Sequence, residues 1–166
     1  ARRIKSHTID NLDYYLELLH ERVTRQGGQV HFARDSNQAN RIVGQVATSH
    51  GVQLAIKSKS MVSEEISLNP YLEKIGVEPV ETDLGEYIIQ LAQEAPFHII
   101  APAVHKSKED VSQLFAEKAG RPNLKEIKEM AQAAREILRD KMISADMGIT
   151  GANFLVAETG SLVLVT

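Results

Sequence analysis

Along the chain, segments whose apolar side chains fall at helical spacing alternate with short apolar runs typical of strands. In residues 11–23 they fall at helical spacing, and two glycines follow, so a helix is predicted there. The short run 29–33 predicts a strand. Asp35 with Gln38 three residues later is typical of a helix start, and Gly51 ends the helix that follows.

The same alternation continues through the rest of the chain. Residues 52–56 alternate without a polar face strong enough to be exposed, as expected for a buried parallel strand. Further short strands are predicted at 77–80 and 97–100. The intervening helices are predicted to start at Pro70, at Asp83 with Glu86, and at Ser107 with Asp110.

The longest predicted helix carries one apolar stripe and leads into a final apolar run at 154–157. The stripe consists of Leu124, Ile127, Ala131, Ala134 and Leu138. Strands that alternate with helices at this rhythm predict an α/β fold, with a mostly parallel sheet flanked by helices. No linker or repeat divides the chain, so one domain is expected over residues 1–166.

Composition narrows the class of protein. The chain has 166 residues, of which 43% are hydrophobic and 25% charged, as in ordinary globular domains. A net charge of -3 without a long basic run argues against a nucleic-acid partner. No apolar run approaches the roughly 18 residues that span a bilayer, so no membrane span and a cytoplasmic location are expected. Without cysteine, the chain itself can hold no disulfide, thiolate nucleophile or iron–sulfur cluster.

The stretch 145–160 combines glycines with polar side chains around an apolar run. Gly148 and Gly151 permit close approach of the backbone to a small ligand. A ligand-binding loop is one reading. The other is that Gly148 ends a helix and residues 158–160 form a hairpin turn. The polar candidates for binding are Asp146, Thr150, Asn153, Glu158 and Thr159, together with Gly151.

A second candidate site follows the predicted strand 52–56. Lys57, Ser58, Lys59 and Ser60 offer two ammonium groups and two hydroxyls before a helix start, which suits a carboxylate or phosphate. No P-loop glycines accompany them, and a solvated turn is the alternative. Both lysines are expected to be exposed, so replacing them with alanine should weaken anion binding without unfolding the domain.

Carboxylates and histidines follow the next two predicted strands. Asp83 and Glu86 are explained by a capping box, although Asp83 also stays a ligand candidate. Glu81 has no such role and could pair with Lys57 or Lys59, or act as a base. His98 and His105 lack a third converging ligand, so no metal site is expected, and His105 is the candidate for proton transfer. Glu158 is a further candidate nucleophile or base.

Four segments carry a resemblance over nearly the whole chain: residues 57–66, 81–90, 96–106 and 145–160. They resemble the lactate utilization protein B family, whose N-terminal part is the LUD domain. The resemblance implies a fold like that of ribose-5-phosphate isomerase, glucosamine-6-phosphate deaminase and the CoA transferases. It also implies a place, with other subunits, in a bacterial complex that oxidises L-lactate to pyruvate. By analogy with the glutamate of the CoA transferases, Glu158 or Glu81 would be the corresponding residue.

The same resemblance places 4Fe–4S clusters in cysteine motifs downstream of the LUD domain. Because this chain lacks cysteine and stops within the apolar run 162–166, we expect it to be an incomplete LUD domain, cut within a strand, that holds no cofactor and is inactive alone. It would support electron transfer and bind a small anionic ligand. The alternatives are a stand-alone enzyme acting on a sugar phosphate or CoA ester, and a structural assembly module.

Overall fold

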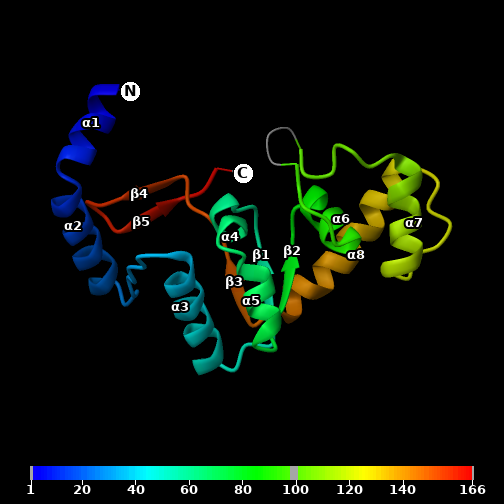
Figure 1. Cartoon of the computed structure of the whole chain (residues 1–166), viewed down its shortest axis with the longest axis horizontal. Helices are drawn as coiled ribbons and strands as arrows, with labels where there is room; N and C mark the ends of the chain where they lie inside the picture. The colour runs from blue at the N-terminus through cyan, green and yellow to red at the C-terminus, as the bar shows by residue number, and fades with distance from the viewer. Residues whose placement is uncertain (1, 98–100, 166) are drawn as a thin grey trace. The chain divides into compact units, whose positions relative to one another are not determined.

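The computed structural model describes residues 2–97 and 101–165, and the chain divides into two compact units (Figure 1). Unit 1 combines Ala1–Arg34 with Gly151–Thr166, and unit 2 is Asp35–Thr150. Unit 1 is therefore built from the two ends of the chain. Unit 2 is continuous and contains the predicted parallel sheet.

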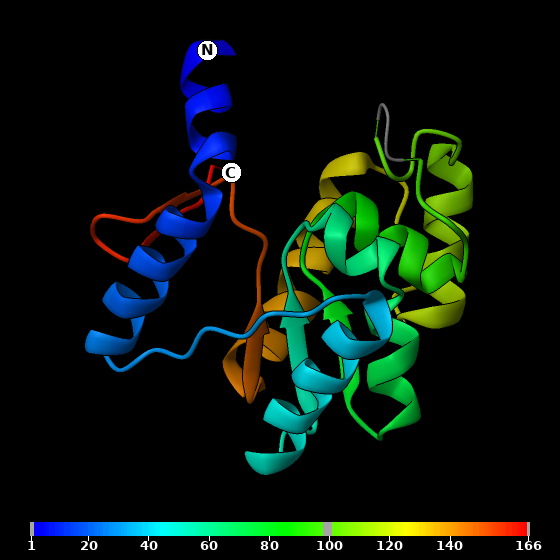
Figure 2. The same ribbon diagram turned by 60° about the vertical axis from the view of Figure 1, so that its left-hand side comes forward.

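The sheet of unit 2 has three parallel strands in the order β2-β1-β3. They are β1 (Leu54–Lys57), β2 (Glu78–Glu81) and β3 (Met147–Ile149). Figure 2 shows β1 and β2 side by side and pointing the same way. β1 is the central strand, as its apolar sequence predicts. The register sets Lys57, the last residue of β1, opposite Glu81 and Ile149, the last residues of its neighbours.

Three helices cover one side of this sheet. They are α3 (Ser36–Ser49), α4 (Met61–Glu65) and α5 (Leu68–Lys74). Their core joins Ala47, Leu68 and Leu72 to Ala55 of β1. The predicted start of α3 is confirmed, because the Asp35 side chain accepts a hydrogen bond from the Gln38 amide.

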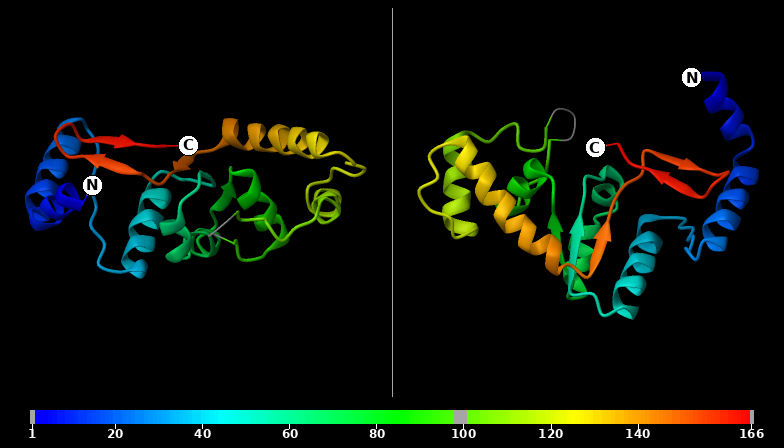
Figure 3. Two further views of the ribbon diagram at one scale, coloured as in Figure 1. Left: turned by 90° about the horizontal axis from the view of Figure 1, so that it is seen from above. Right: turned by 180° about the vertical axis from the view of Figure 1, so that it is seen from behind.

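Three more helices pack together on the strands through a second core. They are α6 (Leu84–Ala92), α7 (Lys108–Lys118) and α8 (Ile127–Ser144). Figure 3 (left) shows α8 along one side of unit 2 and α3 and α5 along the other. Ser107 and Asp110 form the expected capping box of α7. The α/β fold with helices on both faces of a parallel sheet is therefore confirmed. The second core contains Val80, Tyr87, Ile88, Phe115, Ala133, Ala134 and Leu138.

Two details of the helices differ from the sequence prediction. α5 begins at Leu68, so Pro70 is its third residue; the first turn tolerates proline because its amides need no partner within the helix. On α8 the predicted stripe is partly wrong, since Ile127 is 70% exposed and Ala131 is also exposed. Packing selects a neighbouring face, formed by Met130, Ala133, Ala134 and Leu138.

Unit 1 consists of two helices and a hairpin. The helices are α1 (Arg2–Asp10) and α2 (Leu12–Arg25), and β4 (Phe154–Val156) pairs with β5 (Ser161–Val163) in an antiparallel hairpin. The hairpin turn lies against α2: the side-chain Nε2 of Gln26 donates to the Thr159 carbonyl, and a Cβ on Gly160 would be 2.9 Å from the Val23 nitrogen.

The predicted strand at 29–33 is wrong. None of these residues belongs to a strand, and the β4–β5 pair is the only strand pairing in the described part of unit 1. Without a neighbouring strand the backbone amides have no ladder to join. Of the predicted strand 97–100, Phe97 is not in a strand and the other residues lie outside the described ranges. None of the described helices is long and apolar enough to cross a membrane.

Candidate functional site

A buried ion pair links the carboxyl ends of β1 and β2. Lys57 Nζ lies 2.7 Å from Glu81 Oε1, and the two side chains are 1% and 5% exposed. Lys57 Nζ also donates to Ser63 Oγ at 3.0 Å. Pairing of Glu81 with Lys57, one of its two predicted partners, is confirmed. The expected exposure of Lys57 is wrong, because alternation along β1 puts its side chain on the same covered face as Ala55.

Neighbouring helices hold Glu81 in place. Asn69 Nδ2 of α5 donates to Glu81 Oε1 at 2.8 Å. From α6, Gln90 Oε1 accepts from the Glu81 amide at 3.0 Å, while Gln90 Nε2 donates to the Pro79 carbonyl at 2.7 Å. Both the carboxylate and the backbone of Glu81 are thus fixed by amide side chains.

Glu86 is the second buried carboxyl group at this site, with 4% exposure. Burial raises its pKa from 4.5 to about 7, and the negative charges of Glu81, Glu64 and Asp83 and a hydrogen bond to Glu81 add to the shift. A hydrogen bond between two carboxyl groups requires a proton between them. Glu86 can therefore keep a proton up to near neutral pH and donate it toward Glu81.

Asp83 alone caps the amino end of α6, and the Glu86 side chain takes no part in the cap. The Asp83 side chain accepts from the amides of Gly85 and Glu86 at 3.0 and 3.2 Å. The reciprocal bond that would complete a capping box is not formed, because the Glu86 side chain lies against Glu81 instead. The capping role predicted for Glu86 is therefore wrong, while that of Asp83 is confirmed.

The two carboxyl groups line a cavity of about 400 Å³ between α4, α5, β2 and α6. A carboxyl group that titrates near pH 7 beside a cavity can accept or donate a proton during a reaction. The acidic lining also favours a positively charged or hydrogen-bond-donating ligand. The polar lining residues include Glu64, Asn69, Glu73, Glu81, Glu86 and Glu94.

A larger cavity of about 710 Å³ lies beside β2 and helices α6 to α8. Its acidic and basic side chains, such as Glu78 and Lys141, are exposed or half-exposed and pair with each other at the surface. It therefore lacks the buried charges that distinguish the smaller cavity.

Of the hydroxyl groups predicted for anion binding, those of Ser58 and Thr150 lie together at the carboxyl edge of the sheet. Ser58 Oγ and Thr150 Oγ1 are 2.7 Å apart, which joins the ends of β1 and β3. Lys59 is exposed beside them and has no ion-pair partner in the described ranges. Ser60 is used as the N-cap of α4, where its Oγ accepts from the Ser63 amide.

The other predicted binding residues are Asp146 of unit 2 and four residues of unit 1. Asp146 precedes β3, at the opposite edge of the sheet, and its carboxylate accepts from the amides of Gln53 and Leu54 at 2.9 and 3.0 Å. Those two bonds lower its pKa. Four further candidates belong to unit 1: Gly151, Asn153, Glu158 and Thr159.

Asn153 and Thr159 have local partners within unit 1. Asn153 Oδ1 accepts from the Val165 amide at 2.8 Å, and Thr159 Oγ1 donates to Ser161 Oγ at 2.9 Å. Glu158 is exposed in the hairpin turn. The hairpin interpretation of residues 158–160 is therefore confirmed. The other half of that alternative is wrong, because α8 ends at Ser144 and Gly148 lies inside β3, where it pairs with Ile56 of β1.

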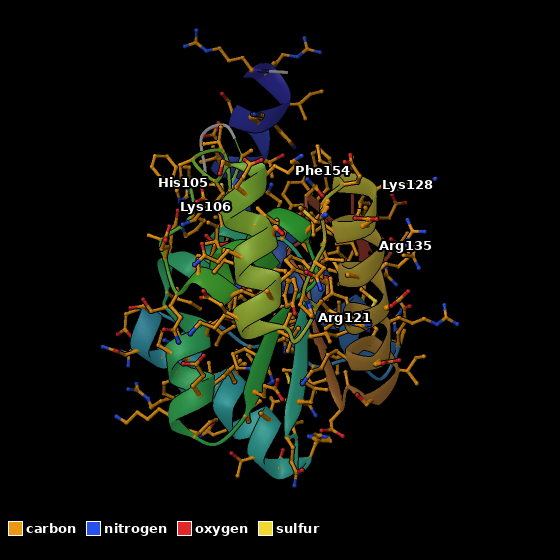
Figure 4. The ribbon with its side chains drawn as sticks, turned by 90° about the vertical axis from the view of Figure 1, so that its right-hand side faces the viewer. His105, Lys106, Arg121, Lys128, Arg135 and Phe154 are labelled. Carbon is orange, nitrogen blue, oxygen red and sulfur yellow. The ribbon has the colours of Figure 1, made fainter. Side chains whose placement is uncertain are left out.

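His105 and Lys106 lie close together at the surface (Figure 4). Both contact Glu94. His105 Nε2 is 2.8 Å from Glu94 Oε2, and its ring centre lies 4.7 Å from that of Phe97. Hydrogen bonds from Lys106 and His105 lower the pKa of Glu94. His98 lies outside the described residues. In the described ranges no three histidine or acidic side chains are grouped to hold a metal ion.

Sequence reasoning missed four residues of the acidic cavity and its ion pair: Glu86 as an ionisable group, and Ser63, Asn69 and Gln90 as partners. One signal was present. Glu86 is followed at once by Tyr87, Ile88 and Ile89, so a carboxyl group there lies within a mostly apolar helix. The serine and the two amides carry no comparable signal, because only the fold brings them to Glu81 and Lys57.

The family model for the LUD domain matches residues 16–166. The chain belongs to the LUD domain family. Two similar proteins, each called Lactate utilization protein B, come from Geobacillus kaustophilus and Bacillus cytotoxicus and are 48% and 49% identical to this LUD domain. The matches cover the whole chain but 35% of each relative. No solved structure gives a significant match, and the likeness to ribose-5-phosphate isomerase and its relatives stays a prediction.

Proposed function

We propose that this LUD domain acts in bacterial lactate utilization, as part of an iron–sulfur subunit in a complex that oxidises L-lactate to pyruvate. The observation that carries the proposal is the identity of 48–49% over the full chain to proteins called Lactate utilization protein B. In this role the domain supports electron transfer and contacts other subunits of the complex.

The chain's donor set does not fit an iron–sulfur cluster, because it contains no cysteine. The 4Fe–4S clusters of this proposal therefore belong to other parts of a longer protein. The chain spans about a third of the length of the relatives it matches, 35%. The test is the iron and acid-labile sulfide content, with EPR spectra, of the intact protein purified without oxygen. Clusters that become reduced by lactate when the partner subunits are added support the proposal, and a protein free of iron refutes it.

The ligand proposed for the carboxyl edge of the sheet is a small carboxylate, with phosphate as the competing anion. Lys59 would supply the ammonium group, and Ser58 and Thr150 the hydroxyls. Lys57, already paired with Glu81, would hold the strand ends in position.

Titration of the chain with L-lactate, followed by amide NMR shifts, tests this ligand. Lys59→Gln should weaken binding severalfold. The matched control is Lys74→Gln, an exposed lysine at the end of α5, just before the amino end of β2. Equal binding by both variants would rule out Lys59 as the anion contact.

A second candidate function is acid–base catalysis on a sugar phosphate or CoA ester. It is favoured by one observation, the buried carboxyl group of Glu86, with its raised pKa, next to Glu81 and beside a cavity. A ligand that binds the folded chain must raise its melting temperature. Such shifts with sugar phosphates or CoA esters, and none with lactate, would favour this function over the first.

A further inference from the structure

Three buried oxygen atoms belong to residues that line the acidic cavity, and apart from the proton that Glu86 can hold they have no hydrogen-bond donor in the described protein. They are Asn69 Oδ1, Glu81 Oε2 and Glu86 Oε2. All three accept hydrogen bonds when the carboxyl groups are ionised. Such oxygens are unfavourable without a donor, so they define the complementary group as one with several N–H or O–H bonds.

The charged side chains around these oxygens determine whether the complementary ligand group should be positively or negatively charged. Glu86 faces Glu81 of β2, Glu64 of α4 and Asp83 at the start of α6. The one buried ammonium group nearby in the described chain, Lys57 of β1, is directed to Glu81 Oε1 and Ser63. Glu73 and Glu94 add negative charge to the lining. The cavity therefore repels anions and attracts cations.

We propose that this cavity binds a small molecule bearing a protonated primary amine, with the ammonium group between Asn69, Glu81 and Glu86. An ammonium group carries three N–H donors and one positive charge, which match three acceptors in an acidic surrounding. A metal ion fits less well, since no three acidic or histidine side chains in the described ranges are grouped to hold one. The site is separate from Ser58, Lys59 and Thr150, and the proposal does not depend on a role in lactate oxidation.

The ammonium group and the proton of Glu86 compete for the same oxygens. Without amine, Glu86 holds a proton near neutral pH; with amine, N–H donors replace that proton, so binding releases it. Because the pKa of Glu86 is about 7, the ionised fraction of this group rises about tenfold between pH 6 and pH 8. The dissociation constant for the amine is expected to fall by about the same factor.

The test uses the full chain with labelled glutamate carboxyl carbons and methylammonium chloride as the probe. We expect the Glu81 and Glu86 signals to shift at saturation, with binding about tenfold tighter at pH 8 than at pH 6. Tetramethylammonium has the same charge but no N–H donor, and should leave these signals unchanged. Equal shifts with both ions, or none with methylammonium, would overturn the proposal. Equal or stronger shifts with K⁺ or Mg²⁺ would also overturn it, in favour of a metal-ion site.

Glu86→Gln supplies the variant test. Glutamine keeps the shape but not the charge, so methylammonium should bind about tenfold more weakly at pH 8 and lose most of its pH dependence. Glu109→Gln, an exposed glutamate on α7, removes one negative charge away from the cavity and should bind like the unchanged chain. If both variants bind alike, the cavity is not the amine site. The pH comparison on the unchanged chain decides the question even if Glu86→Gln fails to fold.

Discussion

Unit 2 and unit 1 bury their apolar residues to very different degrees. In the described ranges, the apolar residues that are more than nine-tenths buried all belong to unit 2, with Leu19 of unit 1 as the exception. Unit 1 instead exposes the strands of its hairpin, where Phe154 is 65%, Leu155 53% and Leu162 59% exposed. Since burial of apolar surface is the main source of stability, unit 2 carries most of the folding free energy.

The difference in burial also determines which kinds of ligand-binding group each unit can hold in a fixed position. A buried charge such as Lys57 or Glu86 needs surroundings that exclude water and hold its partners, and only unit 2 provides them. An isolated hairpin is marginally stable in water, so β4 and β5 depend on their contact with α2. Polar residues of the hairpin therefore lack the rigid support that the acidic cavity has.

The largest difference in stability between the two units is expected when one phenylalanine in each unit is replaced by alanine. Phe115 of unit 2 is fully buried and Phe154 of unit 1 is 65% exposed. Phe115→Ala should lower the free energy of unfolding by about 3–5 kcal/mol, because it leaves a cavity in the core, and Phe154→Ala by about 0.5 kcal/mol or less. Urea unfolding followed by circular dichroism measures both. Similar losses would mean that the units are equally well packed.

A smaller effect is expected from the pH dependence of Glu86. Its folded pKa of about 7 exceeds the ordinary 4.5, so the folded state holds a proton that the unfolded state has released. The free energy of unfolding should therefore fall by about 2–3 kcal/mol as the pH rises from 4.5 to 7, and then stay level. Glu86→Gln cannot ionise and should be more stable than the unchanged chain at pH 8 by this amount.

At pH 4.5 the same variant and the unchanged chain should be about equally stable. The carboxyl groups with lowered pKa, such as Glu94 and Asp146, lose their stabilising effect at still lower pH in both proteins, so they cancel in the difference. Unfolding curves measured at several pH values test this. A constant difference between the two proteins would show that Glu86 holds no extra proton.

The smallest change in stability is expected from replacing a glycine in the hairpin turn of unit 1 with alanine. Gly160 has a φ of 72° and no room for a Cβ beside α2, whereas Gly27 has a φ of 85° and open space. Gly27→Ala should cost about 1 kcal/mol for the backbone conformation alone, and Gly160→Ala about 2 kcal/mol because the turn must also move away from α2. Hydrogen exchange of the β4 and β5 amides measures the loss. Equal exchange in the two variants would remove the contact with α2 as a source of hairpin stability.

Local sequence signals predicted the elements of unit 2 well. The caps at Asp35, Asp83 and Ser107 and the apolar strand β1 each depend on neighbouring residues, and all are confirmed. The segment 29–33 failed for the opposite reason: strand formation needs a partner strand, which the local sequence does not reveal.

The candidate site was predicted in part. Position after a predicted strand correctly brought Lys57 and Glu81 to one edge of the sheet, whereas β3, the strand that brings Thr150 there, was not predicted. Burial was not predictable, because lysine and glutamate are usually exposed and only the strand register placed Lys57 against Glu81 under a helix. For the same reason Glu86 was explained by capping geometry, although the tertiary packing of α6 gives it a different role.

The carboxylate of Asp146 has a consequence for how the protein forms during synthesis. It binds the amides that begin the central strand, across 92 and 93 residues of chain. Until β3 leaves the ribosome, one edge of β1 has no partner, and α3 to α8 must assemble around an incomplete sheet. Closing so long a loop is entropically costly and slows folding. The nascent chain is therefore expected to need chaperone protection of the β1 edge until about residue 150 has been made.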